Sequence, residues 1–139
     1  MIVLHTSVIY ALLDAADARH ELAVAWYRLV DDDLATTPLV LAEADHLTAT
    51  RGGPAATRAF HADLRSGAYA VEWWPGAASL SVEIAERYPD LSIGLADASL
   101  VALAARLETT LIATLDERHF RAMRPLRGGS AFRLLPLDA

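Results

Sequence analysis

The sequence predicts a three-layer α/β/α domain around a mainly parallel sheet, and three observations indicate this fold class. Short apolar runs alternate along the chain with longer segments whose apolar residues recur at helical spacing. The 139 residues, 54% of them hydrophobic, suffice for one compact core but not for two full domains. No internal repeat or low-complexity linker interrupts the alternation. We therefore expect residues 1–139 to form a single domain, with functional residues at the carboxyl ends of the strands.

The first half of the chain predicts two strands and four helices. Its apolar runs give strands over residues 1–4 and 34–37, and its helical spacing gives helices over 8–14, 22–30, 38–50 and 55–65. Thr6 or Ser7 is expected to cap the first helix, and Pro38 suits the first turn of the third. The acidic triplet 31–33 follows the second helix and reads as a solvated loop rather than a metal site.

The second half continues the same alternation. We predict strands over 69–74, 110–113 and 131–135, with helices over 77–88, 97–107 and 117–123. Pro75 and Gly76 turn the chain after the first of these strands. Strands separated by helices favour a parallel sheet covered on both faces.

The absence of two residue types excludes several kinds of chemistry. All 12 basic residues are arginine, so a Walker-type phosphate loop, a phosphate-sensing receiver domain and Schiff-base catalysis are ruled out. Cysteine is absent as well, which rules out disulfides, thiolate zinc sites, iron–sulfur clusters and a cysteine nucleophile.

Charge is distributed unevenly along the chain. The net charge of −6 argues against generic nucleic-acid binding, but residues 116–139 carry five arginines and only three acids. Arg118, Arg121 and Arg124 recur at steps of three beside Asp116, a spacing that Arg127 continues. This spacing fits a patch that contacts phosphates as well as it fits an ordinary solvated face.

The N-terminal residues carry no basic leader, and no apolar run approaches the roughly 20 residues of a membrane span. We therefore expect a soluble cytoplasmic protein without a membrane partner.

Four side chains lie where parallel strands are expected to end. His5 ends the first strand, Asp116 follows the strand over 110–113, and Glu43 and Asp97 lie on helices beside the same edge. The hydroxyls of Thr6, Ser7 and Thr114 are close in sequence to two of them. Converging carboxylates and hydroxyls form an oxygen-rich site of the kind that holds Mg²⁺ or Mn²⁺ and serves phosphodiester hydrolysis. Each acid taken alone is better explained as a helix cap or as a surface group that compensates a helix dipole.

The remaining polar candidates are expected to lie outside this site. Asp45 falls about 200° around the helix from Glu43. The other histidines show no metal-ligand spacing and are expected to be surface or packing residues: His20, His46, His61 and His119.

Four segments resemble PIN-domain ribonucleases, and in particular the toxins of VapBC toxin–antitoxin pairs. They occur in the family's order and span nearly the whole chain: 1–14 with His5-Thr6-Ser7, 38–43 ending in Glu43, 93–98 with Asp97, and 114–120 with Thr114-Leu-Asp116-Glu-Arg-His-Phe. The resemblance implies a PIN-like fold and metal-dependent endonucleolytic cleavage of RNA. It assigns metal binding to Glu43, Asp97 and Asp116, and neighbouring hydroxyl roles to Thr6 and Thr114.

The chain departs from the family pattern at position 5, where the pattern has aspartate and this sequence has His5. A neutral imidazole suits Mg²⁺ poorly, so we expect weakened metal binding and impaired catalysis. His5 is either a natural variant with altered metal preference or an inactivating substitution that protects the host from an active toxin, and we favour the second.

The resemblance also implies partners. A VapB-type antitoxin is expected to dock its C-terminal segment in a groove around the first two predicted helices, which carry more large apolar side chains than one core face needs: Tyr10, Leu13, Trp26, Tyr27 and Val30. A homodimer and an RNA substrate, either tRNA or ribosomal RNA, are implied in the same way. Two alternatives stay open: a catalytically silent module that binds antitoxin or RNA without cutting, and a DNA-directed nuclease of similar fold.

Overall fold

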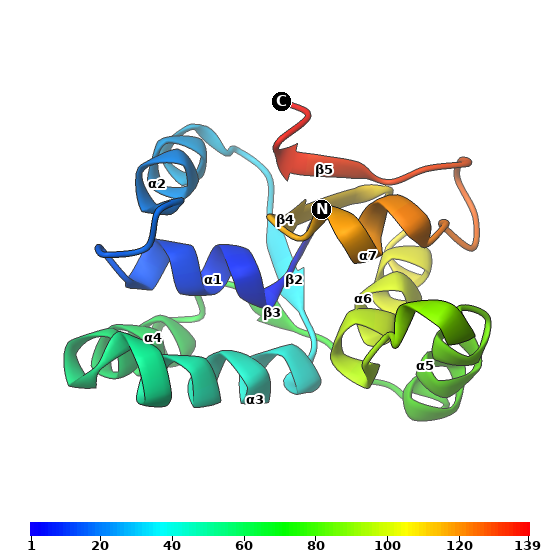
Figure 1. The fold of residues 1–139 in the computed structure, drawn as a ribbon, viewed down its shortest axis with the longest axis horizontal. Coiled ribbons are helices and arrows are strands. Elements are labelled where there is room, and N and C mark those ends of the chain that lie inside the picture. The colour runs from blue at the N-terminus through cyan, green and yellow to red at the C-terminus, as the bar shows by residue number, and fades with distance from the viewer.

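The computed structural model describes residues 1–139, and its strands and helices alternate as predicted (Figure 1). The strands are β1 (Ile2–Leu4), β2 (Leu34–Thr36), β3 (Ala70–Val71), β4 (Leu111–Thr114) and β5 (Arg133–Pro136). The helices are α1 (Thr6–Leu13), α2 (His20–Leu29), α3 (Pro38–Leu47), α4 (Pro54–Ser66), α5 (Ala77–Glu86), α6 (Leu95–Arg106) and α7 (Glu117–Ala122). A π-helical turn covers Thr48–Gly52, and a 3₁₀ turn covers Pro89–Leu91.

All five strands are parallel and follow the order β3-β2-β1-β4-β5. The central strand β1 pairs with β2 on one side and with β4 on the other, with Leu4 opposite Ala113. In Figure 1, α1, α2 and α4 lie to one side of the strands, and α5, α6 and α7 lie to the other. The expected α/β/α fold with a parallel sheet is therefore confirmed.

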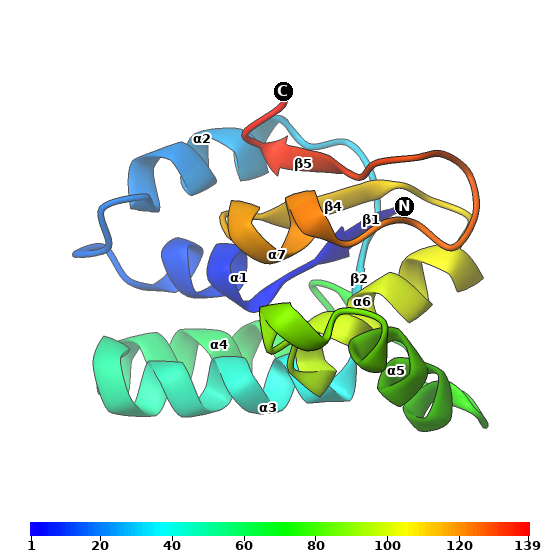
Figure 2. The same ribbon diagram turned by 45° about the vertical axis from the view of Figure 1, so that its right-hand side comes forward.

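Helix α6 forms the apolar centre of its layer. Residues 97–104 are all buried, because α6 packs against β1, α3 and α5 (Figure 2). A helix that is apolar on all sides is stable only when it is covered on all sides. Asp97, in the first turn of α6, is thereby held at the end of the buried region rather than in solvent.

The start of α1 differs from the prediction. The helix begins at Thr6 instead of Val8, and its N-cap is His5, whose Nδ1 accepts a hydrogen bond of 3.4 Å from the Ser7 amide. Neither Thr6 nor Ser7 is the cap. Asp, Asn, Ser and Thr are the usual capping residues, and an imidazole nitrogen here performs the same function.

The strand predicted over 69–74 is reduced to Ala70–Val71, at the edge of the sheet. Only one hydrogen bond extends the pairing, from the Glu72 amide to the Thr36 carbonyl at 2.9 Å. A short edge strand limits the number of unpaired backbone groups that the sheet exposes.

The third predicted helix also ends earlier, at Leu47, and continues as the π-helical turn. A Cβ atom on Gly52 would stand 2.8 Å from the Ala56 Cβ, so this close approach to α4 requires glycine. No helix of the chain combines the length and apolar character that a membrane crossing requires.

Candidate metal centre

Parallel pairing brings three of the predicted residues to the carboxyl edge of the sheet. His5 directly follows β1, and its amide donates to the Ala113 carbonyl at 2.9 Å, which continues the ladder between β1 and β4. Asp116 lies two residues after β4 and caps α7 by accepting from the His119 amide at 3.2 Å. Asp97 reaches the same place from the first turn of α6.

The Asp97 carboxylate lies between two histidine rings. His5 Nε2 donates to Oδ1 at 2.9 Å, and His119 Nδ1 donates to Oδ2 at 2.8 Å. His119 Nδ1 also lies 3.4 Å from Asp116 Oδ2. His5 and Asp97 are buried, and the His5 ring contacts Phe120 edge-on with a centroid distance of 5.0 Å. The two rings therefore satisfy both oxygens of a carboxylate that is shielded from water.

The pKa of Asp97 reflects two opposing effects. Burial raises the pKa of this carboxyl, but the hydrogen bonds and charges of His5 and His119 lower it, and the net shift is downward. Asp97 thus remains an anion in a position where an isolated carboxylate would take up a proton. An ionised carboxylate is the form that binds cations.

Hydroxyl groups hold the other nitrogen of the His5 ring. Nδ1 lies 2.9 Å from Ser7 Oγ and 2.9 Å from Thr114 Oγ1, and Ser7 Oγ accepts from the Leu115 amide at 2.8 Å. Thr114 Oγ1 also accepts from the Asp116 amide at 3.0 Å. The hydroxyl of Thr6 is buried and has no hydrogen-bond partner. Ser7, rather than Thr6, therefore supports the ring.

Two sets of side chains are close enough to hold a divalent cation. The ligand atoms of His5, Glu43 and Asp97 lie within 4.8 Å of one another, as do those of Asp97, Asp116 and His119. Asp97 belongs to both sets, and Glu43 reaches its set from an exposed position on α3. All four of the predicted ligands come together, and His119 joins them.

The comparison with known proteins agrees with this geometry. The PIN domain family matches residues 2–124. The chain belongs to the PIN domain family. It is also 40% identical over 136 residues to Ribonuclease VapC26 of Mycobacterium tuberculosis, which covers 96% of this chain and 99% of that protein. The predicted family resemblance is confirmed, and the chain is a homologue of the VapC ribonucleases.

Two solved structures share this PIN fold. VapC20 of Mycobacterium tuberculosis, described as a toxin that cleaves the sarcin–ricin loop, superposes with a TM-score of 0.80 at 24% identity over 92% of this chain and 100% of that chain. FitAcB from Neisseria gonorrhoeae superposes with a TM-score of 0.58 at 25% identity over 84% of this chain and 88% of that chain.

His119 is a member of the candidate centre that sequence reasoning missed. Its side chain lies in the centre instead of on the surface or in the core as expected, because Asp116 is the N-cap of α7 and one helical turn brings residue 119 back over that cap. The spacing Asp116-x-x-His119 is the signal that could have revealed it. Asp45 and His61, which were expected to lie outside the site, pair with each other at 2.7 Å on the surface.

The three arginines of the predicted RNA-binding patch differ in their surroundings. Arg121 makes two hydrogen bonds to the Asp138 carboxylate, at 2.9 and 2.7 Å, and this pairing lowers the pKa of Asp138 to about 2. Arg118 and Arg124 are exposed, and their guanidinium groups form no ion pair. Arg121 is therefore engaged with a carboxylate, whereas the guanidinium groups of Arg118 and Arg124 have no acidic partner.

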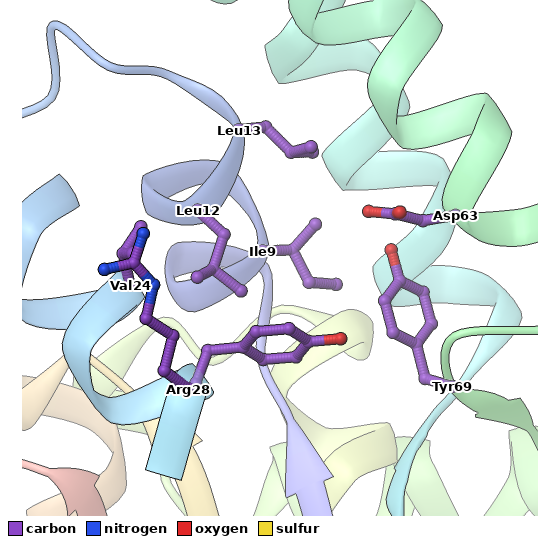
Figure 3. A pocket seen from close by; sticks show the side chains of 8 residues that line it. Ile9, Leu12, Leu13, Val24, Arg28, Asp63 and Tyr69 are labelled. Atoms are coloured by element: carbon purple, nitrogen blue, oxygen red, sulfur yellow. The ribbon is translucent and has the colours of Figure 1, made fainter. Parts of the chain in front are cut away.

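The large apolar side chains of α1 and α2 divide between two hollows. A cavity of about 380 Å³ is lined by Ile9, Leu12, Leu13, Val24, Tyr27, Arg28, Asp63 and Tyr69 (Figure 3). Trp26 and Val30 line a separate hollow beside the C-terminal residues Pro136 and Ala139. Tyr10 lies outside both hollows, and its hydroxyl donates to Asp14 at 2.5 Å.

One end of the larger cavity is polar. In Figure 3 the Asp63 carboxyl and the Tyr69 hydroxyl point toward one another, and the Tyr69 hydroxyl is buried without a hydrogen-bond partner. Burial raises the pKa of the Asp63 carboxyl. The cavity therefore combines apolar walls with a few polar groups at one end, as ligand-binding grooves do.

Proposed function

We propose that this chain is a divalent-metal-dependent endoribonuclease that acts as the toxin of a type II toxin–antitoxin pair. The observation that carries the proposal is the position of Asp97, a buried anion shared by two sets of potential metal ligands at the carboxyl edge of the sheet. Membership of the PIN domain family and the 40% sequence identity to Ribonuclease VapC26 support the same activity. The donor set fits a divalent cation, because every ligand is a carboxylate or an imidazole.

The chain's own residues have separate tasks in this reaction. Glu43, Asp97 and Asp116 hold the metal, which when bound supplies charge to the phosphate and lowers the pKa of an attacking water. Ser7 and Thr114 hold the His5 ring in its orientation. Arg118 and Arg124, which are exposed and unpaired, contact phosphates of the RNA.

His5 lowers activity with Mg²⁺ in this proposal. The set around Glu43 and Asp97 then carries two negative charges, where an aspartate at position 5 would supply a third. Mg²⁺ binds through oxygen and keeps most of its water, so a neutral nitrogen replaces lost charge poorly.

The proposed partner is a VapB-type antitoxin that inserts apolar side chains into the 380 Å³ cavity. Leu13 and Tyr27 line it, and Tyr27 is 40% exposed although it is aromatic. The proposal also includes a single domain, a homodimer, a location in the cytoplasm and a structured RNA substrate, either tRNA or ribosomal RNA.

The test compares the native chain with His5→Asp and Asp97→Asn for cleavage of structured RNA in Mg²⁺ and in Mn²⁺. We expect His5→Asp to cut RNA faster than the native chain in Mg²⁺, and Asp97→Asn to be inactive in both ions. If His5→Asp neither binds metal nor cuts RNA, the nuclease assignment fails.

His5 itself favours a second candidate, a catalytically silent module that binds antitoxin or RNA. In that case the native chain binds RNA in a filter assay but cuts it in neither ion. Cleavage of duplex DNA in preference to RNA would instead identify a DNA-directed nuclease.

A further inference from the structure

The two histidines of the centre occupy equivalent positions around one carboxylate. Each faces a different oxygen of Asp97, and each belongs to one of the two ligand sets, so that both sets consist of one imidazole and two carboxylates. We propose that the centre selects first-row transition ions such as Co²⁺ and Zn²⁺ over Mg²⁺, with Asp97 bridging the two sets. This inference rests on the proposed function only in that it assigns the same side chains to metal binding.

The distances between donor atoms suit such ions. Two neighbouring ligands with metal bonds of about 2.1 Å lie about 3.0 Å apart in an octahedron and about 3.4 Å apart in a tetrahedron. The observed separations are 2.9 Å from His5 Nε2 to Asp97 Oδ1, 2.8 Å from His119 Nδ1 to Asp97 Oδ2, and 3.4 Å from His119 Nδ1 to Asp116 Oδ2. These three pairs of atoms are therefore close enough to be neighbouring ligands of one ion once a metal replaces the proton between them, and Glu43 lies within 4.8 Å of His5 and Asp97.

The surroundings of His5 allow its Nε2 to become a ligand. Binding requires a bare Nε2, so the ring proton must reside on Nδ1. Nδ1 faces the hydroxyls of Ser7 and Thr114, each at 2.9 Å, and a hydroxyl oxygen accepts as readily as it donates. The ring then gives up the 3.4 Å bond from the Ser7 amide and the bond that Nε2 donates to Asp97, and coordination of Nε2 to the metal replaces the second. Ser7 and Thr114 then act as the outer partners that orient metal-binding histidines.

The balance of donor types gives the selectivity. Imidazole nitrogen suits Zn²⁺, Fe²⁺ and Ni²⁺, whereas Mg²⁺ strongly prefers oxygen. For a fixed set of nitrogen and oxygen donors, affinity rises from Mn²⁺ through Co²⁺ toward Cu²⁺. His5 removes one anionic oxygen that Mg²⁺ would need, and His119 adds a second nitrogen that the acidic residues alone would not offer.

Metal binding to the full chain tests this selectivity directly, without RNA. Metal-stripped protein is titrated calorimetrically with CoCl₂ and with MgCl₂, and the visible absorption of bound Co²⁺ is recorded. The variants are His5→Asp, which restores an oxygen donor, and His119→Gln, which removes a nitrogen donor from a half-buried position. The matched control is His61→Gln, because His61 also pairs with an aspartate, Asp45, but on the surface.

We expect the native chain to bind Co²⁺ at least about tenfold more tightly than Mg²⁺, with a visible absorption band that changes when His119 is replaced. His119→Gln should weaken Co²⁺ binding by about tenfold to a hundredfold, His5→Asp should tighten Mg²⁺ binding by at least about tenfold, and His61→Gln should change neither. Equal affinities for the two ions in the native chain, or Co²⁺ binding that neither histidine variant alters, would overturn the inference. If Co²⁺ binds selectively but no ion supports RNA cleavage, the proposed function fails while this inference stands.

Discussion

The buried pair of His5 and Asp97 predicts a large effect of His5→Asp on the stability of the metal-free protein. The pair is nearly inaccessible, with side-chain exposures of 7% and 12%. The substitution removes a hydrogen bond to a buried charged acceptor, which contributes about 1.5–3 kcal/mol. It also places a second carboxylate about 4–5 Å from the first, a repulsion of about 3–4 kcal/mol at an effective dielectric constant of about 20, which proton uptake partly relieves.

The lost hydrogen bond and the part of the repulsion that proton uptake leaves should together lower the free energy of unfolding by about 3–5 kcal/mol and the melting temperature by about 10–15 °C. The assay is thermal and urea unfolding in EDTA, repeated with Mg²⁺. At Mg²⁺ a hundredfold above the variant's Kd, binding linkage should restore about 2.7 kcal/mol, whereas the native chain should respond much less.

The surface supplies a matched control for this prediction. His61 and Asp45 form the same type of pair at 2.7 Å, but their side chains are 53% and 54% exposed. His61→Asp should therefore cost less than about 1 kcal/mol and show no response to Mg²⁺. The reasoning is refuted if metal-free His5→Asp unfolds at the same temperature as the native chain, or if the two substitutions have equal effects.

Three further predictions concern single contacts. The pKa of Asp97 is lowered in the folded state, so its contribution to stability is present above the ordinary carboxyl pKa and is lost as the pH falls through the folded value. In urea titrations, lowering the pH below ~4 should therefore reduce the free energy of unfolding less in Asp97→Asn than in the native chain. The double substitution of Arg118 and Arg124 by alanine should weaken RNA binding and reduce its salt dependence by about one to two counterions, whereas Arg121→Ala should leave that slope unchanged because Arg121 is paired. Tyr69→Phe should leave the free energy of unfolding unchanged or raise it by up to about 1 kcal/mol in urea titrations, since the hydroxyl that it removes is buried without a partner, and a loss above 1 kcal/mol would show that the hydroxyl is bonded.

The fold was predictable because its signals are local. The apolar run at β1 and the alternating helices identify a parallel α/β sheet from sequence spacing alone. The ends of strands and helices were less predictable where contacts with distant parts of the chain determine them. The Tyr69–Trp74 segment has strand-like alternation, yet only Ala70–Val71 pair, because β2 beside them is itself only three residues long.

The candidate centre was predictable in part for the same reason. Parallel strands all present their carboxyl ends at one edge, so the order of motifs was enough to bring His5, Glu43, Asp97 and Asp116 together. The sequence also determined that no lysine or cysteine takes part, and that one of the four acids of the family pattern is a histidine.

Only the tertiary structure decided what each of these side chains contacts. His119 enters the centre because α7 is capped by Asp116, one helical turn before it, and its ring reaches Asp97. The hydroxyl that contacts the His5 ring belongs to Ser7, whereas the hydroxyl of Thr6 is buried without a partner. Arg121 pairs with Asp138 because the C-terminal residues after β5 bring that carboxylate next to α7. Residue type and spacing determine which edge of a sheet a group reaches, but hydrogen bonds of 2.7–2.9 Å depend on helix starts and packing between segments up to 109 residues apart.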